Sequence, residues 1–170
     1  MRATGLRLGD LPLVDAAPLL GAQALGSATE KVLATRAGWA EAEPDLAGRL
    51  LRAIWRAARW LGQSANHSIA ADLLAAPGRL AMGSEVIERG LAGGLVISPD
   101  GAERQVPGFI AFHAGAANFP WRSRAARIGA RLAQRHRLDL GPAIAAAHTV
   151  FRSDLYRQHL QGTGADLPGA

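Results

Sequence analysis

The chain has 170 residues, about half of them hydrophobic, which is enough to bury a core without help from disulfides or a metal. It contains no cysteine, which excludes a disulfide framework, thiolate catalysis and zinc–thiolate sites. The formal net charge of +5 comes almost wholly from arginine, because Lys31 is the only lysine; a compositional bias toward alanine and arginine accounts for this charge without nucleic-acid binding.

Residues 1–28 form the least regular part of the sequence. Pro12, Pro18, Gly21 and Gly26 interrupt short apolar runs, so we expect loop with one short helix around residues 15–25. No uninterrupted apolar run typical of a secretory signal occurs in residues 1–20, and no window has the roughly 18 apolar residues of a membrane span. The sequence therefore predicts a soluble chain.

The next elements are a short strand and the clearest helix of the chain. Residues 30–35 alternate apolar and polar side chains, which predicts a strand. A helix is predicted over residues 44–61, because proline and aspartate begin it and Gly62 ends it. Its 3.6-residue periodicity predicts an arginine face opposite an inward face made of Leu46, Leu50, Leu51, Ile54, Ala58 and Leu61.

Further helices and one hairpin are predicted after Gly62. Asn66 or Ser64 is expected to cap a helix to residue 76 with Ile69, Leu73 and Leu74 inward, and Ser84 a helix to residue 91. Residues 95–98 and 104–112 are expected to form two extended arms around a turn, although a proline and a glycine weaken the second arm. Ser123 is expected to cap a helix to residue 136 with Ala125, Ile128 and Leu132 inward; shorter helices follow over 142–150 and 153–160, then a loose tail from residue 162.

Sequence motifs of common enzymes are missing from the chain. There is no dinucleotide-binding fingerprint, phosphate-binding loop, nucleophile elbow or His-Glu-x-x-His motif. The five histidines occur at no metal-ligand spacing. We therefore expect no enzyme activity, and no metal or cofactor.

The segment Phe109–Trp121 combines four aromatic residues with small residues directly before a predicted helix. Its glycine and alanines allow close approach of the backbone, and Pro120 fixes the direction in which the chain leaves. Taken alone, this pattern is typical of a hydrophobic plug that closes a core. His113, in the middle of this segment, is the histidine best placed for a binding role.

This segment also carries a resemblance to a known family. The run from Phe112 to Ser123, Phe-His-Ala-Gly-Ala-Ala-Asn-Phe-Pro-Trp-Arg-Ser, resembles the signature of the nitrate/bicarbonate-binding proteins of ABC transporters, the NrtA/CmpA/NasS group. Residues 30–33 with Trp39-Ala40, residues 55–61 and residues 154–157 resemble other stretches of that family in the right order. The similarity runs from about residue 29 to residue 160, with an arginine-rich stretch after Trp121 as the main departure.

The resemblance implies an α/β, helix-rich fold corresponding to the carboxyl-terminal part of a two-lobed, type II periplasmic-binding-protein-like receptor. It divides the chain into an irregular segment 1–28, a receptor-like portion 29–161 and the tail 162–170. Lys31 falls at the position associated with the basic residue that contacts nitrate, where bicarbonate binders have an acidic one. The resemblance assigns weaker ligand-lining roles to Trp39, His113, Asn118 and Trp121, and places the remaining ligand contacts upstream of this chain.

The implied function is binding of a small oxyanion of the nitrate, nitrite or bicarbonate class for an ABC transporter permease. An alternative is a NasS-like nitrate or nitrite sensor that holds an RNA-binding antiterminator. The first places the protein in the periplasm if an export signal precedes it, and the second in the cytoplasm. A basic helical nucleic-acid-binding module is a third alternative, because Arg124, Arg127, Arg131 and Arg135 form a stripe.

Overall fold

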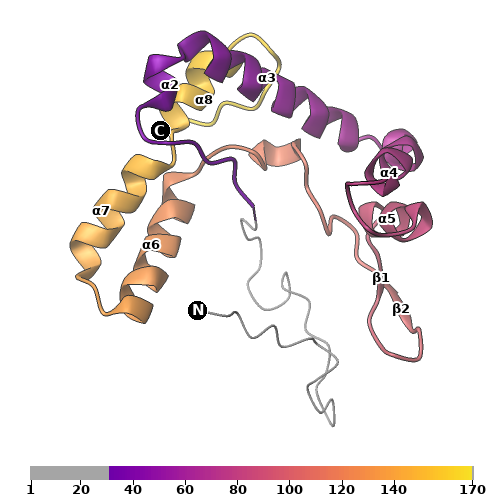
Figure 1. Cartoon of the computed structure of the whole chain (residues 1–170). Helices are drawn as coiled ribbons and strands as arrows, with labels where there is room; N and C mark the ends of the chain where they lie inside the picture. The colour runs from indigo at the N-terminus through magenta and orange to yellow at the C-terminus, as the bar shows by residue number, and fades with distance from the viewer. Residues whose placement is uncertain (1–30, 170) are drawn as a thin grey trace.

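The computed structural model describes residues 31–169, which form an open arch of short helices with one small hairpin (Figure 1). The fold is helix-rich, which is compatible with part of an α/β domain. The elements in chain order are α2 (Trp39–Ala42), α3 (Pro44–Leu61), η2 (Ser64–Asn66), α4 (His67–Ala75), α5 (Ser84–Leu91), β1 (Gly94–Val96), β2 (Glu103–Gln105), η3 (Ala114–Ala116), α6 (Arg122–His136), α7 (Leu140–Val150) and α8 (Ser153–Leu160).

Three groups of elements make up the arch. α3 and α8 pack together with α2 at its top, α4 and α5 with the β1–β2 hairpin form one arm, and α6 and α7 form the other (Figure 1). A loop that contains η3 runs beneath the top and connects the two arms. The chain therefore leaves the top through α3 and returns to it through α8.

A small aromatic core lies where α3, α8 and the η3 loop meet. Trp55 from α3, Phe119 from the loop, and Tyr156 and Leu160 from α8 are buried there together with Ala116. The Phe119 ring meets the ring of Tyr156 edge-on, with 5.4 Å between the ring centroids. Among the large side chains of residues 31–169, only that of Leu160 is fully buried.

The carboxyl-terminal residues lie against this core. The Asp166 carboxylate accepts a hydrogen bond from the Ala116 backbone N–H at 3.2 Å, and Ala165 packs on the buried cluster. The Arg157 guanidinium donates to the Pro168 carbonyl at 2.7 Å. Residues 165–168 therefore close one side of the core, although nothing in their composition distinguishes them from a loose tail.

The predicted helix limits are confirmed where the chain provides strong start and stop residues. α3 begins at Pro44, whose ring fixes a helical φ, and its capping residue is Gly62. α5 and α8 span the predicted residues, and α4, α6 and α7 differ from the prediction by one to three residues at their ends. The capping predictions are wrong: no side-chain capping bond forms at α4, and Ser84 and Ser123 lie inside the first turns of α5 and α6.

The predicted hairpin is confirmed in a shorter form. β1 and β2 pair antiparallel, with Leu95 opposite Arg104. The second arm ends at Gln105 instead of residue 112, because Pro107 has no backbone N–H to donate to a ladder. Gln105 also donates from its side chain to the Ala92 carbonyl at 2.6 Å, which attaches the hairpin to the end of α5.

The strand predicted over residues 30–35 is wrong for its described part. Residues 31–36 are exposed coil, and Glu30 lies outside the described residues, as does the helix predicted around residues 15–25. A strand requires a neighbour that pairs with its backbone groups. No segment among residues 31–169 pairs with this one.

The predicted inward faces of three helices are largely wrong. Ala58 and Ala125 are buried as predicted. Apart from Trp55, the other buried residues of α3 and α6 are small ones that were not predicted inward, namely Ala47, Gly48, Gly129 and Ala133. Small side chains let two helix backbones approach closely, so these faces pack while the aliphatic stripes stay outside. Residues predicted inward but more than a third exposed are Leu46, Ile54, Ile69, Leu73, Ile128 and Leu132.

Exposed aliphatic surface is therefore a defining property of this fold. In a soluble monomer, large contiguous apolar patches are rare and usually mark interaction sites. No helix among residues 31–169 has both the length and the apolar composition needed to cross a membrane. These stripes are surfaces of short amphipathic helices.

Replacing Gly129 with alanine is expected to separate α6 from α7. A Cβ there would lie 2.7 Å from the Ala147 Cβ and 3.0 Å from the Ala143 carbonyl oxygen, so backbone has to move. Overpacking of this kind costs about 1–3 kcal/mol. The measurement is the free energy of unfolding in urea.

The matched control is Gly141→Ala in α7, where an added Cβ meets no atom within 4 Å. Because alanine favours helix over glycine, this variant should be neutral or gain up to about 1 kcal/mol. Equal effects of the two substitutions would show that the α6–α7 contact is looser than the structure has it.

Candidate functional site

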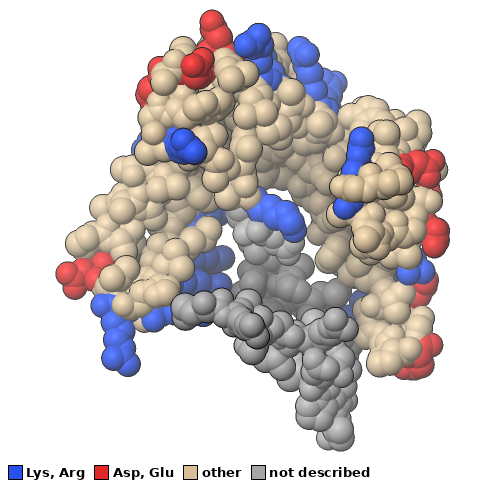
Figure 2. All heavy atoms as spheres, viewed as in Figure 1, with Lys and Arg blue, Asp and Glu red and all other residues tan. Residues whose placement is uncertain are grey.

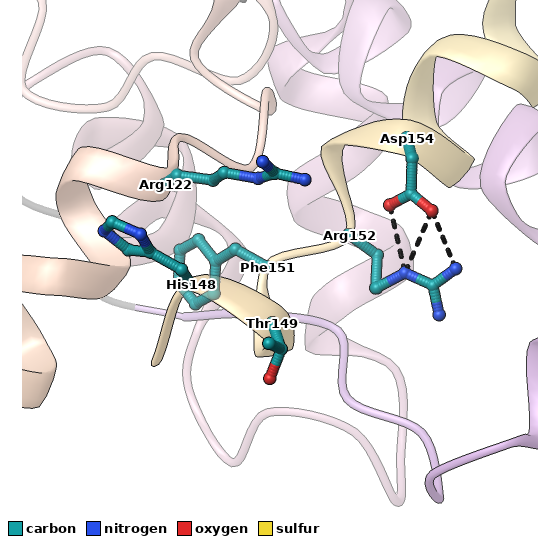
Figure 3. Close-up of a pocket in the computed structure, with 6 residues that line it drawn as sticks. All are labelled: Arg122, His148, Thr149, Phe151, Arg152 and Asp154. Atoms are coloured by element: carbon teal, nitrogen blue, oxygen red, sulfur yellow. Dashed lines mark hydrogen bonds and ion pairs between the residues drawn. The ribbon is translucent and has the colours of Figure 1, made fainter. Parts of the chain in front are cut away.

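A surface pocket of about 400 Å³ lies at the junction of three helix ends. α6 and α8 begin at this junction, and α7 ends there (Figure 3). The amino-terminal ends of two helices thus direct positive dipole ends toward one region. The residues that line the pocket are Arg122, His148, Thr149, Phe151, Arg152 and Asp154.

Arg152 is held on one side of the pocket by two carboxylates. Its Nη2 donates to Asp154 Oδ2 at 2.7 Å and its Nε donates to Asp154 Oδ1 at 3.0 Å. Its Nη1 forms an ion pair with Glu41 of α2. These hydrogen bonds lower the pKa of the Asp154 and Glu41 carboxyls and raise the pKa of Arg152. The network fixes Arg152 and ties α2 to the start of α8.

Arg122 is the cation of the pocket that has no carboxylate partner within residues 31–169. It is the first residue of α6, directly after the Phe-Pro-Trp sequence, and it is exposed. Figure 3 shows its guanidinium extending across the pocket toward the side where Arg152 and Asp154 lie. Glu41 and Asp154 both pair with Arg152, so the four charged groups sum to zero, and Arg122 is the cation whose donors face no carboxylate within residues 31–169.

The remaining polar residues contribute less to the charge of the pocket. His148 lies in the last turn of α7 and adds an imidazole to the lining. Thr149 donates its hydroxyl to the Ala146 carbonyl at 2.8 Å, and in Figure 3 this hydroxyl points away from Arg122. The arrangement suits a small monoanion that accepts hydrogen bonds from a guanidinium at a helix start.

A second surface pocket of about 500 Å³ lies along the outer side of α3. Its chemistry is aromatic and cationic, and the Arg59 guanidinium lies over the Trp55 ring at 5.6 Å from the centroid. This contact covers one face of the buried Trp55 ring. The lining residues are Trp55, Arg56, Arg59, Trp60, Gln63, Gly162 and Thr163.

The predicted site residues on the Phe109–Trp121 segment lie in the core loop. Trp121 is half-buried, donates its indole N–H to the Ala116 carbonyl at 3.3 Å and packs edge-on against Phe119. His113 and Asn118 are half-buried, and His113 Nδ1 and Asn118 Oδ1 are buried without hydrogen-bond partners among the described residues. The His113 ring packs on Gly62, where an added Cβ would lie 2.6 Å from its Nδ1. These contacts are those of a core plug.

Lys31 and Trp39 lie apart from that loop in the sequence, and neither lines either pocket described above. Lys31 is exposed on the coil before α2, and Trp39 is half-buried at the first residue of α2. The ligand contacts assigned to these five residues stay predictions.

Arg122, His148 and Arg152 were not singled out as site residues from the sequence. Arg122 had a signal, because it follows Trp121 inside the motif that carries the family resemblance. No sequence pattern marked Arg152 or His148, since their proximity to Arg122 depends on how α7 returns along α6. No group of histidine and acidic residues that could hold a metal ion occurs among residues 31–169.

Comparison with protein families gives one match. Residues 27–75 match the NMT1-like family. This is a family of substrate-binding proteins for nitrate, sulfonate and bicarbonate, which at the level of the family indicates an ABC-type anion-binding component. The match covers the coil from Lys31, α2, α3 and α4, and it stops before the core loop and the pocket at Arg122. No curated protein and no solved structure matches the chain.

The Arg152 network predicts a loss of stability in acid. The ordinary pKa values of the Glu41 and Asp154 carboxyls are 4.5 and 3.8, and both are lowered in the fold. The network therefore stabilises the fold fully above these values and loses its contribution as pH falls through the lowered ones. The effect is small, because all three side chains are partly exposed and screened.

The measurement is the urea midpoint between pH 7 and pH 3 at low salt, for the unmodified chain and for Arg152→Met. Arg152→Met should have a lower urea midpoint than the unmodified chain at pH 7, and its midpoint should fall less as the pH is lowered to 3. Arg56→Met on the exposed face of α3 is the matched control and should keep the pH dependence. Parallel pH profiles for the unmodified chain and Arg152→Met would refute a role for this network in stability.

Proposed function

We propose that the chain is the small-oxyanion-binding part of a substrate-binding component of an ABC transport system, with nitrate or nitrite as the type of ligand. The observation that carries this proposal is the match of residues 27–75 to an anion-binding family, in a chain whose junction pocket has an arginine that no carboxylate of residues 31–169 pairs with. An ABC permease is the partner that this function requires.

Arg122 is suited to a planar monoanion. A guanidinium presents a rigid fork of N–H donors that fits two oxygens of nitrate at once. At about 4 Å and an effective dielectric constant near 20, such a pair attracts by roughly 4 kcal/mol before desolvation costs. Because Arg122 is exposed, water screens much of this attraction. Even the full ~4 kcal/mol corresponds to a dissociation constant of only about 1 mM, so the chain alone is expected to bind nitrate at millimolar strength or more weakly.

Lys31 is the second proposed contact. It lies inside the matched residues 27–75, on coil that has no side-chain partner in the described part of the chain. A compact ammonium on a flexible stem adds a point charge with adjustable donors. An acidic residue at this place would repel nitrate, which gives specificity by exclusion.

The binding step is tested by calorimetric titration with nitrate. We expect a dissociation constant on the order of 1 mM for the chain alone. Arg122→Met should weaken binding about tenfold, equivalent to about 1.4 kcal/mol, because it removes the paired donors but keeps the length of the side chain. Lys31→Glu should weaken it further by repulsion.

Arg56→Met on α3 is the control for a general loss of positive charge and should leave nitrate binding unchanged. Binding that is insensitive to both Arg122→Met and Lys31→Glu would refute the assigned contacts. No heat of binding at nitrate concentrations well above the millimolar range would refute the function itself.

Transport and sensing differ in the macromolecular partner. A receptor for import binds a permease, whereas a sensor of the NasS type holds an antiterminator regulator. The transport function is favoured here because the matched family consists of substrate-binding proteins. Stable, nitrate-dependent co-purification with an RNA-binding regulator would replace it with the sensing function.

A further inference from the structure

The side of α6 that is turned away from α7 combines an aliphatic stripe with a row of arginines. Against α7 the helix buries Ala125, Gly129 and Ala133. Ile128 and Leu132 lie beside this buried face and are 40% and 49% exposed. The arginines occupy the adjoining positions, so the open side of α6 is at once apolar and strongly basic.

No carboxylate in the helix offsets this charge. α6 contains five arginines, and no acidic residue occurs between Glu103 and Asp139. Lys and Arg side chains gather over this arm on the side that faces the hollow of the arch (Figure 2). Arg127 and Arg131 are exposed and form no ion pair within residues 31–169. Like charges four residues apart on a helix repel by a few tenths of a kcal/mol, so an acidic partner would relieve this repulsion.

A segment with the complementary composition is present in the same chain. Residues 8–25, Leu-Gly-Asp-Leu-Pro-Leu-Val-Asp-Ala-Ala-Pro-Leu-Leu-Gly-Ala-Gln-Ala-Leu, contain seven leucine or valine residues together with Asp10 and Asp15. No lysine or arginine occurs between Arg7 and Lys31. The segment therefore offers aliphatic side chains and carboxylates to a surface that has exposed aliphatic side chains and arginines.

The length of the chain permits this contact. The described residues begin with the coil before α2, which runs from the top of the arch into the space between its two arms (Figure 1). At about 3.3 Å per residue, 18 extended residues span roughly 60 Å. A helix of 15 residues is only about 22 Å long. Length does not limit the contact, and covalent attachment keeps the effective concentration in the millimolar range.

We propose that residues 8–25 bind the face of α6 that is turned away from α7, with Asp10 and Asp15 against the arginine row and the leucines on Ile128 and Leu132. The exposed aliphatic stripe argues against a nucleic acid, since α6 has no aromatic side chain on which bases could stack. This inference is independent of anion binding.

The absence of native cysteine allows one introduced cysteine to carry a single nitroxide. The test places the label at Ala17→Cys in the full chain and measures paramagnetic broadening of backbone amide signals by NMR. We expect the α6 amides around Ile128 and Leu132 to lose most of their intensity. The α4 amides around Ile69, an equally exposed aliphatic stripe without arginines, should not be broadened.

Charge exchange tests the pairing directly. Arg127→Glu with Arg131→Glu should abolish the broadening, and adding Asp10→Arg with Asp15→Arg should restore it. Arg49→Glu with Arg56→Glu on α3 is the matched control and should leave it intact. Because all four arginines are exposed, helix content measured by circular dichroism should change little in these variants.

Several results would overturn the proposal. Uniform or absent broadening on α6 would show that the segment does not bind there. Broadening that persists when labelled chain is mixed with isotope-enriched unlabelled chain would assign the face to a second copy. Broadening that survives the charge reversal would show that the carboxylates play no part.

Discussion

The ring of Phe119 lies where the top of the arch meets the loop between its arms, and the described fold depends on this contact. It meets Trp121 on one side, with 4.9 Å between ring centroids, and Tyr156 of α8 on another, while the Arg157 guanidinium lies 4.8 Å from its centroid. Burying one such ring and its neighbours contributes several kcal/mol. Without this ring, α8 would lose its contact with the loop that leads into α6.

The pocket at Arg122 is a consequence of the same contact. Phe119 and Trp121 fix the backbone immediately before α6, and therefore fix where its first residue begins. On the other side, the Arg152 network fixes the start of α8. The pocket is thus framed by two well-held points, whereas the Arg122 guanidinium between them pairs with no carboxylate in the part of the chain that the structure describes. A site of this kind orients a cation through the backbone and leaves its donors available for a ligand.

Most of the helices could be predicted from the sequence, because their limits are local properties. Pro44 and Gly62 delimit α3 through the backbone angles that they allow, and no tertiary contact is needed for that. Which face of each helix is buried could not be predicted in the same way. Periodicity identifies which side chains favour burial, such as Leu46 and Ile54, but α3 and α6 pack through alanine and glycine because these permit close approach.

The strand was predicted wrongly and the pocket was not predicted, for a related reason: both depend on contacts between residues distant in the sequence. Residues 31–36 have the alternation of a strand, but pairing requires a neighbour, and none is present in the part of the chain that the structure describes. Arg122 and Arg152 share a pocket only because α7 returns antiparallel to α6. The sequence did identify the Phe-Pro-Trp run as special, and its alternative interpretation as a plug describes the positions of Phe119 and Trp121 well.

The way in which the α6–α7 pair is joined to the rest of the chain allows a ligand in the pocket to affect the orientation of the pair. These two helices make extensive contacts with each other, and the chain enters and leaves the pair at Trp121–Arg122 and Phe151–Arg152. Both connections border the pocket. An anion bound according to the proposed function would contact Arg122 on the helix pair and lie beside Arg152 at the start of α8. If the anion bound more tightly in one orientation of the α6–α7 pair relative to α8 than in another, binding would favour that orientation by the difference in binding free energy. The weak affinity expected for the chain limits this difference to a few kcal/mol, enough to bias a junction of two backbone connections but not to reorganise the aromatic core.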